Sequence, residues 1–147
     1  MKLRLRIPGA PVAKARPKFF RRGDHVGTYK PKAQEEAEGQ FVFYAKKQLR
    51  IQGAVSPIPA GAAVRLKCWF FMPIPKSASK KFHAECREKN VPHTKKPDLD
   101  NLVKFVKDCL NGHAWHDDSQ VVEIAGRKFY AENPMTFVVI ETLEDAA

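Results

Sequence analysis

The sequence predicts an α+β fold, with a single domain over residues 1–147. We expect a mixed or mostly antiparallel sheet of about four to five strands together with about three helices. Some segments alternate apolar and polar residues, as half-buried strands do. Others place apolar residues three and four positions apart, as amphipathic helices do. The two kinds of segment are interspersed, with no repeat, low-complexity tract or domain boundary between them.

The N-terminal third contains a predicted strand, a basic loop and a helix. Residues 2–7 alternate basic and apolar side chains, which predicts a half-buried strand with a basic outer face. Residues 13–29 follow as a basic hairpin or loop that turns near Gly23. A helix then begins at Pro31, because proline is tolerated in the first helical turn, and runs to about Arg50.

The rest of the chain adds two more helices and three strands. Residues 63–72 are rich in strand-forming residues and end at Pro73. Ser77 is a candidate cap for a short polar helix. Another helix runs from Asp98 to Asn111-Gly112, with an apolar stripe along one side. The last two strands are predicted at about 120–130 and 136–143.

Positive charge is concentrated near the N-terminus. The chain has 26 Lys and Arg against 16 Asp and Glu, a formal net charge of +10. Residues 1–32 contain ten of these basic residues and one acid, whereas residues 129–147 contain four acids and no Lys or Arg. This asymmetry favours one basic face, and a polyanion such as nucleic acid is the natural partner for it.

Cysteine usage and hydropathy indicate the compartment. Cys68, Cys86 and Cys109 are odd in number and widely spaced, which favours neither a disulfide framework nor a zinc finger. The longest apolar stretch, which begins at Cys68, is much shorter than the ~20 residues of a membrane-spanning helix. We therefore expect a cytoplasmic protein.

Two pairs of carboxylates flank the helix that begins at Asp98. Asp98 and Asp100 occupy its cap and first turn, where backbone N–H groups favour negative charge, so capping alone would explain them. Asp117 and Asp118 come after Gly112, and a loop that turns back could carry them to the start of the helix. Oxygen ligands converging there would suit Mg²⁺ or Mn²⁺.

Asp100, Lys104 and Asp108 are spaced i, i+4 and i+8 and form one polar row on this helix. A row of surface ion pairs would have the same spacing as a catalytic lysine beside a metal site. His113 and His116 flank the second acidic pair, but without cysteine ligands or an H-E-x-x-H helix we expect them to be exposed loop residues.

Seven basic residues are candidate phosphate contacts, because they lie in the basic N-terminal segment or in the connector before Asp98. They are Lys14, Arg16, Lys18, Arg21, Arg22, Lys95 and Lys96. Phe19 and Phe20 lie among them and could wedge into unpaired bases near a branch point. Two adjacent aromatics in a strand are also explained by one buried and one exposed ring.

Two motifs at a fixed spacing carry a family resemblance. The run K-P-D-L-D-N-L-V-K-F-V-K-D-C-L-N-G, followed by W-H-D-D-S-Q-V, resembles the central signature of the RusA family of Holliday-junction resolvases. P-G-A-P-V-A-K-A-R-P-K-F is similar to the family's basic N-terminal stretch, and R-K-F-Y to its late strand. The resemblance covers residues 1–143 and is concentrated in 95–122.

The resemblance implies a RusA-like fold and a homodimeric, Mg²⁺-dependent endonuclease that nicks four-way DNA junctions symmetrically, in recombination and repair. Mn²⁺ would substitute for Mg²⁺. It makes Asp98, Asp100 and Asp118 the metal ligands and Lys104 a catalytic residue that stabilises developing phosphoryl charge. Asp117 is either an outer ligand or a structural cap.

Two other functions fit part of the sequence. A non-catalytic nucleic-acid-binding module would use the positive charge, with the carboxylates only capping a helix. A metal phosphohydrolase acting on a small substrate would use the carboxylates but would leave the +10 charge unexplained. The second acidic pair and the position of Lys104 favour the nuclease over the binding module.

Overall fold

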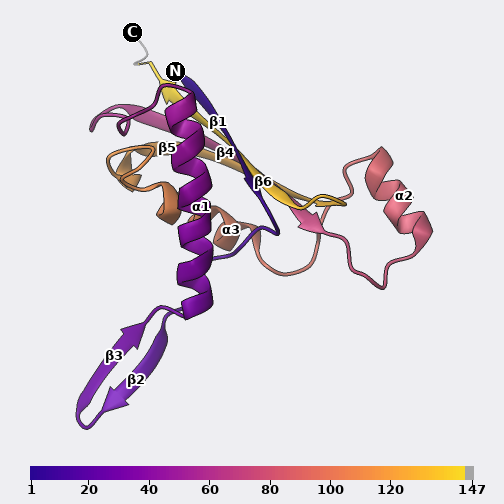
Figure 1. The fold of residues 1–147 in the computed structure, drawn as a ribbon, viewed down its shortest axis with the longest axis horizontal. Coiled ribbons are helices and arrows are strands. Elements are labelled where there is room, and N and C mark those ends of the chain that lie inside the picture. The colour runs from indigo at the N-terminus through magenta and orange to yellow at the C-terminus, as the bar shows by residue number, and fades with distance from the viewer. Residues whose placement is uncertain (145–147) are drawn as a thin grey trace.

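The computed structural model describes residues 1–144 and confirms the predicted α+β class (Figure 1). A four-stranded sheet has the order β1-β6-β4-β5, and a separate hairpin consists of two short strands. The bounds are β1 Lys2–Pro8, β2 Lys18–Arg22, β3 His25–Tyr29, α1 Lys32–Ile51, β4 Ala63–Pro73, α2 Lys80–Glu88, α3 Leu99–Leu110, the 3₁₀ turn η1 Asp118–Gln120, β5 Val121–Ala131 and β6 Met135–Leu143. No helix in the described part of the chain is long and apolar enough to cross a membrane.

The sheet is mixed, as expected. β1 pairs antiparallel with β6 and β6 antiparallel with β4, whereas β4 and β5 are parallel. Parallel neighbours need a long connection, and here it contains α2 and α3. The cap of α2 is Ser79, whose hydroxyl accepts a hydrogen bond from the Phe82 N–H at 3.1 Å, so the prediction of Ser77 was two residues too early.

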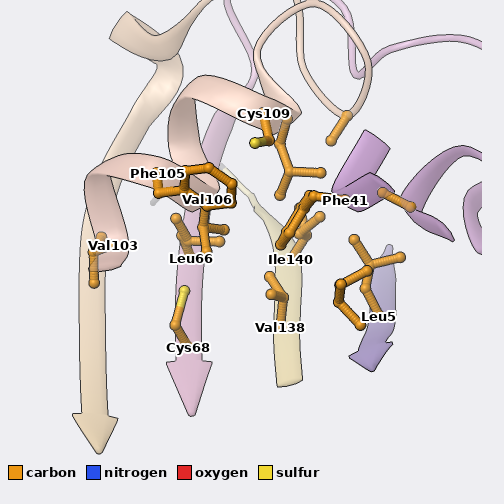
Figure 2. Close-up of a cluster of buried hydrophobic side chains, with 14 of the residues drawn as sticks. Leu5, Phe41, Leu66, Cys68, Val103, Phe105, Val106, Cys109, Val138 and Ile140 are labelled. Atoms are coloured by element: carbon orange, nitrogen blue, oxygen red, sulfur yellow. The ribbon is translucent and has the colours of Figure 1, made fainter. Parts of the chain in front are cut away.

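The core lies between one face of the sheet and the helices α1 and α3 (Figure 2). Alternate strand residues point into it, including the fully buried Leu5, Leu66 and Val138. Phe41 of α1 meets Phe105 of α3 edge to face, with ring centroids 5.8 Å apart. The apolar stripe predicted for the Asp98 helix is therefore its core-facing side.

The outer edge of β1 is closed by two glutamines of α1. The side-chain amide of Gln48 accepts a hydrogen bond from the Arg6 N–H and donates one to the Arg6 carbonyl, both at 2.7 Å. Gln52 does the same at Arg4, at 2.9 and 2.7 Å. One helical turn rises about 5.4 Å, and two strand residues span about 6.6 Å. Two glutamines one turn apart on the helix can therefore reach the backbone of alternate strand residues, one each. The amides substitute for a neighbouring strand.

The outer edge of β5 is only partly covered. The Tyr130 N–H donates to the Val91 carbonyl at 3.0 Å, and the His93 N–H donates to the Lys128 carbonyl at 3.1 Å. Within residues 1–144, no strand pairs with this edge over residues 121–127. The sheet therefore has one closed edge and one that is open along more than half its length.

The β2–β3 hairpin extends beyond the end of α1, away from the sheet (Figure 1). Its two strands are stabilised by the Phe20 ring, which lies over Gly27. A Cβ at position 27 would come within 2.5 Å of that ring, so any larger residue would require the Phe20 side chain to move. Where the hairpin leaves the body, the Lys14 N–H donates to the Asn101 carbonyl at 2.9 Å.

Candidate functional site

Two exposed carboxylates lie at the start of α3. Asp98 occupies the cap position with extended backbone angles, but its side chain makes no cap hydrogen bond. Asp100 follows in the first turn. Neither carboxylate forms a hydrogen bond or an ion pair within residues 1–144. The capping explanation therefore does not account for Asp98, and both groups are free to bind a cation.

Lys104 lies one turn further along, on the wall of a groove between α3 and β5. The groove has a volume of about 640 Å³ and is lined by Leu99, Asp100, Val103, Lys104, Lys107, Ile124 and Gly126. Gly126 allows the close packing, because a Cβ there would lie 3.2 Å from the Val103 side chain. The groove places the ammonium group of Lys104 on the same side of the helix as Asp100.

The alternative of a surface ion-pair row along α3 does not hold. Asp108 pairs instead with Lys14, with the Lys14 Nζ and the Asp108 Oδ2 2.9 Å apart. In the described chain, Lys104 has no acidic partner within 4.0 Å. Lys104 is therefore a free cation beside a free carboxylate.

The second acidic pair divides into two roles. The Asp117 carboxylate accepts the Ser119 N–H at 2.9 Å and, with Gln120, forms a capping box at η1. These hydrogen bonds from Ser119 lower the pKa of Asp117. The Asp118 Oδ1 accepts the indole N–H of Trp115 at 2.8 Å. Because Trp115 is fully buried, this bond fixes Asp118 to the core.

Asp118 lies near the opposite end of α3 from Asp98 and Asp100. The loop after the helix folds onto its last turn: the Ala114 N–H donates to the Leu110 carbonyl at 2.9 Å, and the Gly112 N–H donates to the Trp115 carbonyl at 2.9 Å. The helix has 12 residues and is therefore about 18 Å long. Among residues 1–144 of one chain, no three His, Cys, Asp or Glu side chains are grouped to hold a metal. The expected convergence is not formed within one chain.

Six of the seven candidate DNA contacts are exposed, and the seventh, Lys14, is held in an ion pair. Lys18, Arg21 and Arg22 are exposed on the hairpin, and Arg16 is exposed beside it; Lys95 and Lys96 are exposed just before α3. Lys14 is half-buried, and its hydrogen bond with Asp108 raises its pKa. Its ammonium group is already occupied by Asp108 and, at 3.6 Å, by Glu38.

The two hairpin aromatics face opposite sides of the ribbon. Phe20 covers Gly27 and lies near Tyr29, with ring centroids 6.3 Å apart. Phe19 is 75% exposed on the other side. Of the two rings proposed as a wedge, Phe19 is the more exposed, since Phe20 is 38% exposed.

Sequence reasoning missed the part played by Lys128. Its Nζ donates to the Lys95 carbonyl at 2.5 Å and to the Pro97 carbonyl at 2.7 Å, so it fixes the connector that leads into Asp98. The residue lies in the R-K-F-Y motif, which was the available signal. His113 is half-buried and His116 exposed, and neither belongs to a metal-binding group in the described residues.

Comparisons with known proteins show the family of the chain. The family model described as Endodeoxyribonuclease RusA matches residues 8–141. The chain is also similar to an uncharacterized protein, YqaN, of Bacillus subtilis (strain 168). The two are 35% identical over 140 residues, which cover 94% of each chain. The family match spans the segments that contain both acidic pairs, Lys104 and the basic hairpin.

Proposed function

Because the chain belongs to the RusA family of endodeoxyribonucleases, we propose that it resolves four-way DNA junctions by symmetric nicking. We place this activity in DNA recombination and repair and infer a dependence on Mg²⁺, which Mn²⁺ can replace. The observation that carries the proposal is the free pair of carboxylates at the start of α3 beside the unpaired Lys104. All three groups are therefore available to a metal ion or a phosphate.

The residues fit a hard divalent cation. Asp98 and Asp100 offer carboxylate oxygens with no other partner among residues 1–144, and Asp118 has one oxygen beyond the one that Trp115 engages. Oxygen ligands of this kind suit Mg²⁺. When bound, the metal would supply a hydroxide nucleophile and polarise the phosphodiester. Asp117 serves as a cap, so we place it outside the ligand set.

We propose that a second copy of the chain completes the site. The open stretch of β5, residues 121–127, can pair antiparallel with the same stretch of a second copy around a twofold axis. In this antiparallel pairing, the first residues of the second copy's open stretch would lie beside the last residues of the same stretch in the first copy. Asp118 of the second copy comes just before its open stretch, so it would lie there too. That end of the first copy's stretch lies against the connector to Asp98, because Lys128 is bonded there. The exposed Val122 and Ile124 would be covered by this contact.

The remaining groups then have distinct tasks in the reaction. Lys104 stabilises the negative charge that develops on the phosphoryl group. The Trp115 indole holds Asp118 in one orientation through its 2.8 Å hydrogen bond. The exposed cations of the hairpin and connector bind phosphates on the junction arms. A homodimer carries two such sites, which is the arrangement required to nick two opposed strands.

The test is incubation with a mobile four-way junction and Mg²⁺, with products resolved on a denaturing gel. We expect paired nicks for the wild type. We expect almost none for Asp98→Asn or Asp100→Asn, with junction binding retained because each variant loses a charge without gaining bulk. Glu88→Gln, an exposed acid on α2, is the matched control and should cleave normally. Binding without cleavage by the wild type would favour a non-catalytic module.

Mixed dimers test whether the site is shared. Consider a dimer in which one subunit carries Asp98→Asn and the other carries Asp118→Asn. If each site takes Asp118 from the other chain, one of the two sites contains no substitution and is intact. We expect such co-expressed dimers to recover nicking of a single strand. If every site lies within one chain, the mixed dimer contains no intact site and remains inactive.

A further inference from the structure

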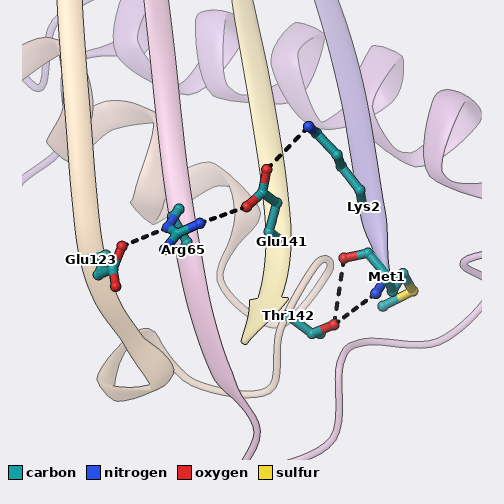
Figure 3. Close-up of polar contacts among 6 residues, drawn as sticks. All are labelled: Met1, Lys2, Arg65, Glu123, Glu141 and Thr142. Atoms are coloured by element: carbon teal, nitrogen blue, oxygen red, sulfur yellow. Dashed lines mark hydrogen bonds and ion pairs between the residues drawn. The ribbon is translucent and has the colours of Figure 1, made fainter. Parts of the chain in front are cut away.

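The face of the sheet that points away from α1 and α3 carries no helix within residues 1–144, and Figure 3 looks onto it. Strand register divides its side chains into four rows, each crossing β1, β6, β4 and β5. From one end to the other, the rows are Lys2-Glu141-Arg65-Glu123, Arg4-Val139-Lys67-Ala125, Arg6-Phe137-Trp69-Arg127 and Pro8-Met135-Phe71-Phe129.

The first row is electrically neutral and paired within itself (Figure 3). Glu141 bridges two strands, at 3.3 Å from the Lys2 Nζ and 3.0 Å from the Arg65 Nη1. The Arg65 Nε also lies 2.5 Å from Glu123. Both acids of this face are used here, so this end of the sheet offers no net charge to a partner.

The other three rows combine positive charge with aromatic rings. They hold four cations and no acid, and the cations are Arg4, Arg6, Lys67 and Arg127. Trp69 packs against Phe137 with ring centroids 5.4 Å apart, and the Arg6 guanidinium lies 5.5 Å from the Phe137 ring. Phe71 and Phe129 form a second pair, at 6.4 Å. All four rings are partly exposed.

We propose that this face binds single-stranded DNA, with bases stacked on Trp69 and Phe71 and phosphates held by the surrounding cations. Unpaired bases present flat aromatic faces that stack on such rings whatever their sequence, and the backbone supplies the negative charge. An intact duplex exposes its phosphates but hides its base faces, so it would leave the rings unused. Two copies of this face would repel each other, because each carries four cations that have no ion pair within residues 1–144.

The dimensions of the face set the length of strand that it holds. Neighbouring strands lie about 4.8 Å apart and successive rows about 6.6 Å apart. The four rings span three strands and two rows, so the aromatic part is roughly 10 Å by 7 Å. The four-stranded sheet of RNA-recognition motifs stacks two or three bases on its aromatic rings, and we expect a similar number here. The proposed surface lies across the sheet from α3, so binding here does not require the cleavage site and does not depend on junction resolution.

Tryptophan fluorescence provides a direct measurement. The sequence contains two tryptophans, and Trp115 is 0% exposed, so quenching by an added strand reports Trp69. We expect a twelve-nucleotide oligo-dT, added without Mg²⁺, to quench the emission, and added salt to reverse the quenching. With a labelled strand, Trp69→Ala should weaken binding about tenfold, since one base stack contributes about 1–3 kcal/mol.

Three further measurements make the result decisive. Trp69→Phe keeps a ring and should bind nearly as the wild type does, which separates lost stacking from lost folding. Phe43→Ala removes an exposed ring of α1, outside this face, and should change nothing. Arg127→Ala should weaken binding and lower its salt dependence. Absence of quenching, or equal binding by Trp69→Ala and the wild type, overturns the proposal, as does quenching that a duplex of equal length produces as strongly.

Discussion

At the residue scale, adjacent side chains of identical chemistry have different surroundings. Asp117 caps a short helical turn through the Ser119 N–H, whereas Asp118 accepts a hydrogen bond from a buried indole. Both are aspartates in the same loop, so only their hydrogen bonds distinguish them. This difference leads to an unequal effect of substitution.

We predict that Asp118→Asn nearly abolishes junction cleavage and that Asp117→Asn reduces it much less. Asparagine is as good a helix cap as aspartate, so Asp117→Asn keeps the turn in place. Single-turnover cleavage at saturating junction measures both variants, with circular dichroism to confirm folding. If Asp117→Asn proves the more damaging change, the two carboxylates have been assigned the wrong way round.

For Lys104 we predict a loss of rate without a loss of stability. Lys104 has no ion pair in residues 1–144, so Lys104→Ala should leave the thermal midpoint unchanged. Loss of one electrostatic stabiliser of a transition state costs on the order of 10²-fold or more in rate. Lys81→Ala, an exposed lysine on α2, is the control. Near-normal cleavage by Lys104→Ala would remove this residue from the catalytic group.

The sequence predicts which residues are candidates for the site, but it does not predict how they are arranged in space. The D-x-D and D-D motifs and Lys104 are visible in the sequence because their spacing is local. The loop between Gly112 and Asp118 could fold toward either end of α3, and its direction depends on Trp115 entering the core. The R-K-F-Y motif draws attention to Lys128, but its hydrogen bonds reach a segment about 30 residues away, so the motif alone does not predict their partners.

At the scale of elements, the edges of the sheet are treated differently. The amides of Gln48 and Gln52 satisfy the backbone of β1, while β5 remains open over residues 121–127. Strands and helices were predictable because hydrophobic periodicity marks them. The pairing order was not, since nothing local shows that the first strand meets the last or that β4 and β5 are parallel.

We predict that Gln48→Ala and Gln52→Ala each lower the free energy of unfolding by about 1 kcal/mol. Each glutamine makes two hydrogen bonds to strand backbone, and a hydrogen bond contributes a net 0.5–1.5 kcal/mol, with the lower values expected at this exposed edge. Urea unfolding measures the change. Gln40→Ala, an exposed glutamine of α1 with no side-chain bond in the described residues, is the control and should unfold like the wild type.

The segment that covers the end of β5 gives the fold a pH dependence. His93 is 8% exposed, its Nδ1 has no hydrogen-bond partner in residues 1–144, and its ring lies 4.7 Å from that of Tyr130. Burial and the nearby Lys128 lower the pKa of His93 below its ordinary 6.5. The unfolded chain therefore binds this proton more readily, and stability falls as the pH drops through about 6.5.

We predict that His93→Phe, which keeps a ring against Tyr130, flattens this dependence. The thermal midpoint of the wild type should fall more steeply than that of the variant between pH 7.5 and 5.5, whereas above pH 7.5 the two curves should run parallel. Differential scanning calorimetry in matched buffers makes the comparison. Equal slopes across the whole range would show that His93 titrates as it does in the unfolded chain.

At the scale of the whole molecule, positive charge is arranged in separate regions. The hairpin extends from the body with Lys18, Arg21 and Arg22 exposed, while Lys14 at its base is paired with Asp108. A formal net charge of +10 therefore overstates what a DNA arm meets in any one place. Removal of the exposed hairpin cations should therefore cause the largest fall in the number of counterions released when DNA binds.

We predict that replacing Lys18, Arg21 and Arg22 together with Ala flattens the slope of log K against log salt by about two to three units for junction binding. Lys14→Ala should change that slope little and lower the thermal midpoint instead, because it leaves Asp108 without its partner. Fluorescence anisotropy over a salt series measures the slopes. A steeper change for Lys14→Ala than for the hairpin variant would reverse these roles.

The pairing of β1 with β6 also determines the order in which the chain can assemble during synthesis. β1 is the first strand to be made, yet its sheet partner within residues 1–144, residues 135–141, is the last. At about 5–20 residues per second, the ribosome needs on the order of ten seconds to supply it. Leu3, Leu5 and Ile7 remain without a neighbouring strand for that time, and α1 can meet them first through Gln48 and Gln52. The nascent chain thus has a helix to shield its earliest strand well before the sheet exists.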